Sequence, residues 1–214
     1  MIRVLLVEDH ASFRQPLAFV LGREPDITVV AQAGSLAEAR QHLEGIDVAI
    51  VDLGLPDGRG IDLVQELRAV NPHGAVLVLT ASLDRREHAR AVEAGASGVL
   101  HKSAEIDDVV RAVRRLAAGE LALSREEVVE LLGLASQQSQ AGAARLALRQ
   151  LTQREREVLQ ALGDGLSDKE IAHRLSLSPQ TVRNHMMNIL GKLGAHSRLQ
   201  ALVVAVRHGI VAIR

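Results

Sequence analysis

The stretch that decides the fold is VAIVD at residues 48–52, four consecutive apolar residues followed by a carboxylate. An apolar run of this length, rich in β-branched residues, is typical of a strand buried on both faces. Such strands belong to parallel sheets, which carry helices on both sides. The stretch therefore predicts an α/β domain with Asp52 at the carboxyl end of a central strand.

The same alternation of short apolar runs and amphipathic segments extends over the first 120 residues. The predicted strands are 2–7, 27–31, 48–51, 76–79 and 99–100, and the predicted helices are 12–21, 35–43, 60–70, 84–94 and 106–118. Five strands alternating with five helices favour a parallel sheet covered on both faces.

The last part of the chain, from residue 151, has no strand pattern and predicts four helices. Two capping boxes and one cap followed by proline mark the first three starts: Thr152 with Glu155, Ser167 with Glu170, and Ser178 before Pro179. The fourth helix is predicted at about 197–208, with Gly209 as its stop.

Charge and composition divide the chain in the same way. Residues 1–120 carry 13 basic and 18 acidic side chains, whereas residues 151–214 carry 9 and 5. Between these two parts, the composition of residues 121–150 predicts a linker. It contains one predicted short helix at 124–132 and a stretch of polar and small residues at 135–144. We therefore predict domains at 1–120 and 151–214, and the basic end points weakly to nucleic acid.

Composition also excludes several classes of protein. The 214 residues include no Cys, which excludes disulfide scaffolds, thiolate metal sites and thiol catalysis. Phe13 and Phe19 are the only aromatic residues, too few for a single-strand base-stacking platform. The N-terminus lacks a signal-peptide pattern, and no apolar run approaches the roughly 18 residues of a membrane helix. We expect a cytoplasmic protein with no membrane partner.

Polar side chains follow four of the five predicted strands. Glu8 and Asp9 follow the first, Asp52 the third, Thr80 the fourth and Lys102 the fifth. Because the carboxyl ends of parallel strands meet at one edge, these groups should converge. Three carboxylates favour a hard cation such as Mg²⁺. A carboxylate can also act as nucleophile on phosphorus, with a lysine and a metal neutralising the phosphoryl charge.

Taken alone, each of these residues is more often a helix cap, a strand-ending residue or a surface charge than part of a site. Their combination occurs in four motifs: LLVEDH at 5–10, VDLGLPDGRGIDL at 51–63, LVLTAS at 77–82 and GASGVLHKS at 95–103. Together these motifs resemble the receiver domain of bacterial two-component response regulators over about residues 1–120.

The resemblance implies a flavodoxin-like sheet of order 2-1-3-4-5 and assigns roles to individual residues. Asp52 would accept phosphate from a sensor histidine kinase, Thr80 would bond the phosphoryl oxygen as a switch, and Lys102 would pair with it. The implied Mg²⁺ ligands are Asp9, Asp52 and the Gly54 carbonyl, with Glu8 acting through water. Two positions depart from the usual receiver pattern: Glu8 stands where an Asp is usual, and Val99 stands where an aromatic switch residue is usual.

The helix predicted after Ser178 has two faces. Val182, Met186, Ile189 and Leu193 have the spacing of a buried stripe. The other face carries Arg183, Asn184 and Met187, whose side-chain types are used at base edges in the major groove. A short helix and a tight turn precede this helix, as in a helix-turn-helix. On spacing alone, a small helical bundle with a polar face fits equally well.

The stretch from about residue 151 to 210 resembles the LuxR-type helix-turn-helix nearly throughout, on the string LTQREREVLQALGDGLSDKEIAHRLSLSPQTVRNHMMNILGKLGAHSRLQAL at 151–202. With the receiver, this combination is similar to the NarL/FixJ class of response regulators. The resemblance implies a four-helix domain with recognition helix 178–192 and a dimer interface on helix 197–208. Arg183, Asn184 and Met187 would face bases, and Lys169 and Thr181 would face phosphates.

We therefore expect a DNA-binding transcriptional regulator, controlled by phosphorylation of Asp52 and dimeric on activation or on promoter DNA, rather than an enzyme. One alternative is a phosphorylation-independent regulator whose receiver serves as a dimerisation or ligand module, which Val99 and Glu8 favour. The other is a haloacid-dehalogenase-like phosphatase. Phosphatases of that class carry their nucleophilic Asp after the first strand, with a second Asp two residues later. Here Asp52 follows the third strand, and the residue two positions later is Gly54.

Overall fold

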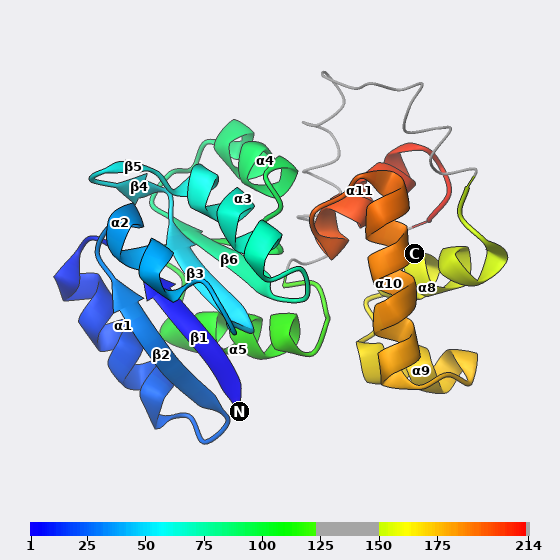
Figure 1. The fold of residues 1–214 in the computed structure, drawn as a ribbon, viewed down its shortest axis with the longest axis horizontal. Helices are drawn as coiled ribbons and strands as arrows, with labels where there is room; N and C mark the ends of the chain where they lie inside the picture. Colours follow the sequence, from blue (N-terminus) through cyan, green and yellow to red (C-terminus); the bar gives the residue numbers. More distant parts are fainter. Residues whose placement is uncertain (123–149, 213–214) are drawn as a thin grey trace.

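The computed structural model describes residues 1–122 and 150–212, which form an α/β domain and a helical domain. In Figure 1 the two domains lie side by side, with α4 and α11 between them. The predicted helix at 124–132 and most of the predicted linker lie outside the described residues. The domain boundaries at 120 and 150 therefore stay predictions.

The α/β domain contains a parallel sheet of five strands. They are β1 (Ile2–Val7), β2 (Ile27–Ala33), β3 (Val48–Asp52), β6 (Ala75–Thr80) and β7 (Gly98–His101). Their order in the sheet is β2-β1-β3-β6-β7, and every neighbouring pair is parallel. Since β6 and β7 are the fourth and fifth strands of this sheet, the predicted order 2-1-3-4-5 is confirmed.

Five helical segments cover the two faces of the sheet. They are α1 (Ala11–Arg23), α2 (Leu36–Ala39), α3 (Gly60–Val70), α4 (Arg85–Glu93) and α5 (Ile106–Ala117). Alternate residues of β3 enter different cores: Val48 and Ile50 join α1 and α5, whereas Ala49 and Val51 join α2, α3 and α4. All five residues of β3 are buried, as a strand covered on both faces requires.

Two local features differ from the sequence prediction. The predicted helix 35–43 is shorter, with α2 followed by a 3-10 turn, η1 (Arg40–His42). The chain after β3 also forms a two-stranded hairpin, β4 (Gly54–Leu55) with β5 (Gly58–Arg59), which was not predicted. Strands of two residues carry too little periodicity to be recognised in a sequence.

The helical domain consists of four described helices. They are α8 (Gln153–Gly163), α9 (Asp168–Leu175), α10 (Pro179–Leu193) and α11 (Arg198–Arg207). Both predicted capping boxes are present, and Ser178 caps α10 through the Thr181 amide. The buried stripe of α10 is confirmed for Val182, Met186 and Ile189, but Leu193 is only half-buried. No helix in the described part of the chain is long and apolar enough to span a membrane.

Candidate functional site

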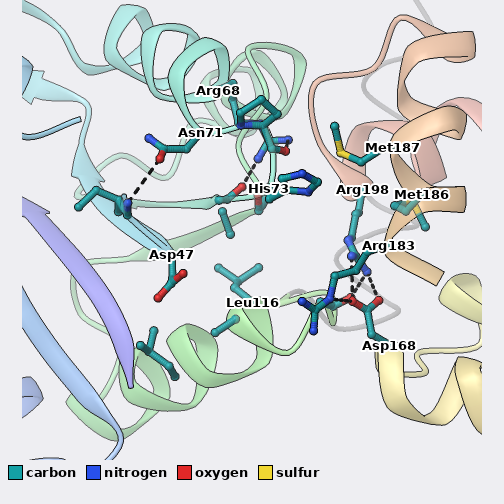
Figure 2. A pocket seen from close by; sticks show the side chains of 18 of the residues that line it. Asp47, Arg68, Asn71, His73, Leu116, Asp168, Arg183, Met186, Met187 and Arg198 are labelled. Atoms are coloured by element: carbon teal, nitrogen blue, oxygen red, sulfur yellow. Dashed lines mark hydrogen bonds and ion pairs between the residues drawn. The ribbon is translucent and has the colours of Figure 1, made fainter. Parts of the chain in front are cut away.

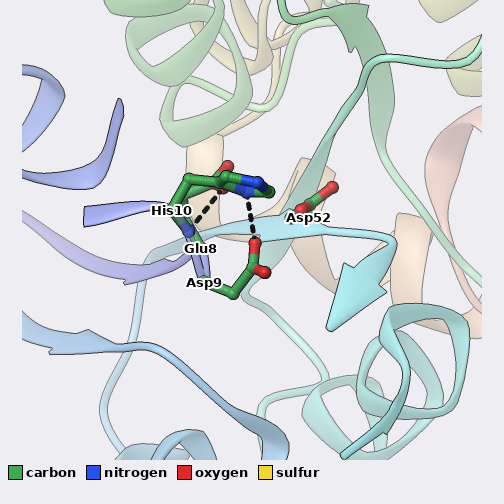
Figure 3. Close-up of side chains that lie close together, drawn as sticks. All are labelled: Glu8, Asp9, His10 and Asp52. Carbon is green, nitrogen blue, oxygen red and sulfur yellow. Dashed lines mark hydrogen bonds and ion pairs between the residues drawn. The ribbon is translucent and has the colours of Figure 1, made fainter. Parts of the chain in front are cut away.

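A pocket of carboxylates lies at the carboxyl edge of the sheet, as predicted. Glu8 and Asp9 follow β1, and Asp52 is the last residue of β3. Ligand atoms of Glu8, Asp9, His10 and Asp52 all lie within 4.8 Å of one another (Figure 3). Glu8 and Asp52 are only 1% and 5% exposed. Like charges are therefore held close together with little solvent to screen them.

Lys102, which follows β7, supplies the nearest cation. Its Nζ lies 2.8 Å from Asp52 Oδ2 and 3.0 Å from Glu8 Oε1. Burial alone would lower the pKa of Lys102, but its hydrogen bonds to Asp52 and Glu8 raise that pKa above the ordinary value. The ammonium also lies 5.6 Å from the centre of the Phe13 ring, within cation–π range. Lys102 is thus fixed in its charged form beside Asp52.

His10 joins the acidic cluster, although the sequence prediction did not include it. Its Nδ1 lies 2.6 Å from Asp9 Oδ1 and 3.2 Å from Glu8 Oε1. These contacts, first with Glu8 and then with Asp9, raise the pKa of His10. Burial raises the pKa of Asp9, but His10 outweighs it and the net shift is downward. Nothing in the sequence distinguishes His10 from an ordinary surface histidine, so this contact could not be predicted.

Two glycines after Asp52 lie close to this residue, Gly60 at its backbone carbonyl and Gly54 at its carboxylate. A Cβ at Gly60 would lie 2.0 Å from the Asp52 carbonyl oxygen, so only glycine fits there. A Cβ at Gly54 would lie 3.8 Å from Asp52 Oδ2, which places the Gly54 backbone beside the pocket. Three carboxylates with one lysine leave an excess of negative charge. Such an oxygen-rich donor set suits a hard divalent metal.

Thr80 ends β6, the strand next to β3, and is 3% exposed. Asp52 lies opposite Leu79 in the ladder, so Thr80 is one residue beyond the level of Asp52. Its hydroxyl oxygen accepts a hydrogen bond from the Ser82 backbone amide at 3.0 Å. The structure therefore brings Glu8, Asp9, Asp52 and Lys102 into contact, while Thr80 lies at the same edge bonded to its own loop.

The second candidate site is the exposed side of α10. Arg183 and Asn184 are exposed, Thr181 and Met187 are half-buried, and Lys169 is exposed near the start of α9. The turn between α9 and α10 places Ser176 in the left-handed conformation (φ 54°). This gives α9 and α10 the short connection of a helix-turn-helix. The DNA-contacting roles of these five residues stay predictions.

The side of α10 that carries Arg183 and Met187 faces the α/β domain. A cleft of about 950 Å³ separates the domains, lined on one side by Arg183, Met186 and Met187 and on the other by Arg68 and His73 (Figure 2). Within the helical domain, Arg183 Nε lies 3.4 Å from the buried Asp168 carboxylate. The sequence gave no sign of this cleft, because it depends on how two separate domains dock.

Hydrogen bonds hold the domains together at two places. At the end of α5, Arg198 donates to the Gly119 carbonyl at 2.8 Å, and the Asp168 amide approaches the Ala118 carbonyl at 3.4 Å. At the end of α4, Ser197 Oγ donates to the Ala96 carbonyl at 3.0 Å, and Gln200 Nε2 donates to the Glu93 carbonyl at 3.2 Å. The start of α11 is therefore docked on the α/β domain.

Comparison with known proteins agrees with both halves of the chain. Residues 4–114 match the family described as the response regulator receiver domain, and residues 149–205 match the luxR family of bacterial regulatory proteins. The chain is 37% identical over 211 residues to the DNA-binding transcriptional activator DevR/DosR of Mycobacterium tuberculosis, covering 96% of this chain and 94% of that protein. It is 32% identical over 202 residues to the nitrate/nitrite response regulator NarL of Escherichia coli K12, covering 94% and 93%.

Among solved structures, a two-component response regulator of the LuxR family from Aurantimonas sp. SI85-9A1 matches with a TM-score of 0.55. It is 29% identical and covers 63% of this chain and 98% of its own. The predicted resemblance is thus supported by sequence, by domain order and by fold. The chain belongs to the two-component response regulators that join a receiver domain to a LuxR-type helix-turn-helix domain.

Proposed function

We propose that this chain is a transcriptional regulator switched by phosphorylation. Asp52 accepts a phosphoryl group from a sensor histidine kinase, and the helical domain then binds promoter DNA as a homodimer. The observation that carries the proposal is the contact of Lys102 with the buried Asp52 carboxylate at 2.8 Å. The relative DevR/DosR is named a DNA-binding transcriptional activator, which supports DNA binding as the role of the helical domain.

The pocket residues would divide the phosphoryl-transfer step among them. The Asp52 carboxylate forms a bond to phosphorus while the phosphorus–nitrogen bond of the kinase phosphohistidine breaks, and the leaving imidazole takes up a proton. Lys102 neutralises the phosphoryl oxygens as a point charge. Mg²⁺, held by Asp9, Asp52 and the Gly54 carbonyl with Glu8 through water, would supply further charge neutralisation when bound.

The arrangement of the two domains supports a closed resting state. Arg183 and Met187 line the cleft, so the side of α10 that carries them faces the α/β domain, with Arg183 exposed to the solvent of the cleft. A recognition helix must enter a major groove about 12 Å wide, which requires that domain to move away. The start of α11, the predicted dimer interface, is also held by the α/β domain through Ser197 and Gln200. Phosphorylation would release both surfaces by shifting the population toward an open form.

The test compares wild type with Asp52→Asn, treated with a small phosphodonor and Mg²⁺. Wild type should gain one phosphoryl group by intact mass and retain genomic DNA fragments more tightly, whereas Asp52→Asn should do neither. Asp62→Asn is the matched control, because Asp62 is an exposed residue of α3 and does not belong to the carboxylate cluster. Equal DNA retention by wild type and Asp52→Asn would reject phosphorylation control.

The closed state has its own test at Gly119, which has φ +79°. A Cβ there would lie 2.6 Å from Arg198 Nη1 and 2.8 Å from Asp168, so Gly119→Ala should separate the domains. Gly165→Ala is the control, because Gly165 has φ +84° with nothing within 4 Å. Small-angle X-ray scattering should show a larger radius of gyration for Gly119→Ala alone. Equal radii for the two variants would contradict the closed resting state.

A second candidate is a regulator that binds DNA without phosphorylation. The observation that favours it is Val99, a 6% exposed aliphatic side chain at the position where a receiver usually has an aromatic switch residue. Mass spectrometry after phosphodonor treatment separates the two candidates. Absence of phosphoryl transfer to wild type, together with unchanged DNA binding, would favour this second function.

A further inference from the structure

The loop between β6 and α4 is held by two histidines from different elements. His101 Nε2 lies 3.0 Å from the Ala81 carbonyl oxygen, and His88 Nε2 lies 3.0 Å from the Ser82 carbonyl oxygen. A carbonyl oxygen can only accept, so each Nε2 carries the proton and donates. Two consecutive carbonyl oxygens thus each accept a hydrogen bond from an imidazole. The imidazole of His101 lies at the end of β7, and that of His88 lies on α4.

The remaining nitrogen of His101 fixes the orientation of its ring. Nδ1 accepts a hydrogen bond from the Ser103 backbone amide at 3.1 Å and lies 2.6 Å from Ser103 Oγ. His101 is directly opposite Thr80 in the β6–β7 ladder. His101 therefore ties the loop after Thr80 to the loop after Lys102, on the two sides of the Asp52 pocket.

Ser82 links this arrangement to Thr80. The Ser82 amide donates to Thr80 Oγ1 at 3.0 Å, while the Ser82 carbonyl accepts from His88. If the Thr80 hydroxyl turns toward a phosphoryl group on Asp52, the Ser82 amide loses its acceptor. An amide left without an acceptor is costly where it is shielded from water, so the loop must rearrange. His88 transmits that movement to α4 because it is bonded to the same residue.

The other end of α4 reaches the helical domain. His88 lies five positions before Glu93, whose carbonyl accepts from Gln200 of α11. Three residues after the end of the helix, the Ala96 carbonyl accepts a hydrogen bond from Ser197 Oγ. A continuous helix transmits displacement along its axis, and α4 therefore joins the Ser82 contact to the interdomain contact.

We propose that His88 and His101 are positioning residues that couple the Asp52 pocket to the contact between the domains. This inference rests on the proposed phosphorylation switch. His101 anchors the β6–α4 loop to the β7 end of the pocket, and His88 carries its displacement into α4. The buried Val99 has no ring or polar group that could bond to this loop, so the coupling depends on the imidazoles.

The test measures domain opening directly, since the chain has no native Cys. Cysteines introduced at the exposed Gln65 of α3 and Gln153 of α8 carry spin labels, and pulsed electron paramagnetic resonance reports their separation. Beryllofluoride with Mg²⁺ serves as the phosphoryl mimic. Wild type should shift toward longer distances on adding the mimic. His88→Leu and His101→Leu should each reduce the shifted fraction at least fivefold.

Conservative variants separate coupling from a purely structural role. The amide nitrogen of glutamine can take the place of Nε2, so His88→Gln and His101→Gln should retain most of the opening. His42→Leu, at an exposed histidine of η1, is the matched control and should open like wild type. Phosphoryl uptake by Asp52 from a small phosphodonor should stay within twofold of wild type in all these variants.

Opening of both leucine variants at the wild-type level would overturn the inference, while the proposed switch would stand. Parallel loss of phosphoryl uptake and opening would also overturn it, because the histidines would then serve the pocket itself. A wild type that takes up phosphate but does not open would reject both the inference and the closed-to-open switch.

If a leucine variant fails to fold, ¹⁵N-histidine NMR on the wild-type protein tests the coupling instead. The Nε2 signals of His88 and His101 should shift with the mimic and that of His42 should not, and unchanged signals at all three would contradict the coupling.

Discussion

Each domain contains a buried carboxylate bonded to a lysine, but the two sites differ in charge balance. In the helical domain, Glu155 is 2% exposed and both of its carboxylate oxygens lie within 2.8 Å of Lys192 Nζ. In the α/β domain, Lys102 alone is shared between Asp52 and Glu8. One carboxylate with one ammonium is neutral, whereas the pocket has more acids than lysines.

The origin of the two sites also differs. Glu155 belongs to the capping box of α8 and accepts from the Thr152 amide at 2.7 Å and the Thr152 hydroxyl at 3.0 Å, so the carboxylate is anchored locally, while its lysine comes from α10. The pocket residues come from three different strand ends. The comparison teaches that a balanced, locally anchored pair stabilises a fold, whereas an unbalanced cluster is built to receive a cation or a phosphoryl group.

The largest effect is expected from breaking the balanced pair. Glu155→Ala should destabilise the helical domain by about 3 kcal/mol, because it removes the capping box and leaves the Lys192 charge without its partner. Asp52→Ala should change stability by less than about 1 kcal/mol, since Lys102 keeps Glu8. Because the chain lacks Trp and Tyr, native-state hydrogen exchange of α8 and α10 is the suitable measurement.

Glu157→Ala is the control for this comparison. Glu157 is on the same helix, but it is 37% exposed and pairs with Arg154 at the surface. If Glu157→Ala and Glu155→Ala cost the same, the buried pair has no special structural role.

Magnesium should act on the unbalanced site only. At roughly ten times its Kd, Mg²⁺ should stabilise the α/β domain by about 1.4 kcal/mol and leave the helical domain unchanged. Hydrogen exchange of β3 and β6 should slow on addition and recover with a chelator. Asp9→Asn should remove the effect and Asp62→Asn should keep it. Equal protection of both domains would indicate non-specific screening rather than a site.

The smallest effect is the pH dependence of the balanced pair. Burial raises the pKa of Glu155, but Lys192 and the Thr152 cap outweigh it and lower that pKa below its ordinary value of 4.5. A carboxyl with a lowered folded-state pKa contributes stability above its unfolded pKa and loses it as pH falls through the folded pKa. Between pH 7 and pH 4.5, the stability contributed by Glu155 should therefore fall by at most about 0.4 kcal/mol.

The measurement for the pH effect is the difference between wild type and Glu155→Gln across that range. Glutamine cannot titrate, so its stability curve should lack this contribution. Parallel curves for the two proteins would show that Glu155 has no shifted pKa.

Several elements were predictable because their signals are local. Gly60–Val70 was predicted at its observed bounds, and the caps at Thr152, Ser167 and Ser178 were all correct. A cap needs only a side chain and an amide two or three residues apart, so sequence spacing fixes it. The β4–β5 hairpin and the early end of α2 were missed because the long-range environment decides such short elements.

The sequence by itself determined the alternation of strands and helices, the caps of the first three helices of the helical domain and the presence of acids at strand ends. These depend on periodicity and on neighbours a few residues apart. Only the tertiary structure decided that His10 joins the pocket, that His88 and His101 bond one loop, and that Arg183 faces the α/β domain across the cleft. His10 contacts its neighbours Glu8 and Asp9, but its approach to Asp52 and the contacts of the other residues join separate elements, whose geometry is fixed only when sheet, helices and domains pack against one another.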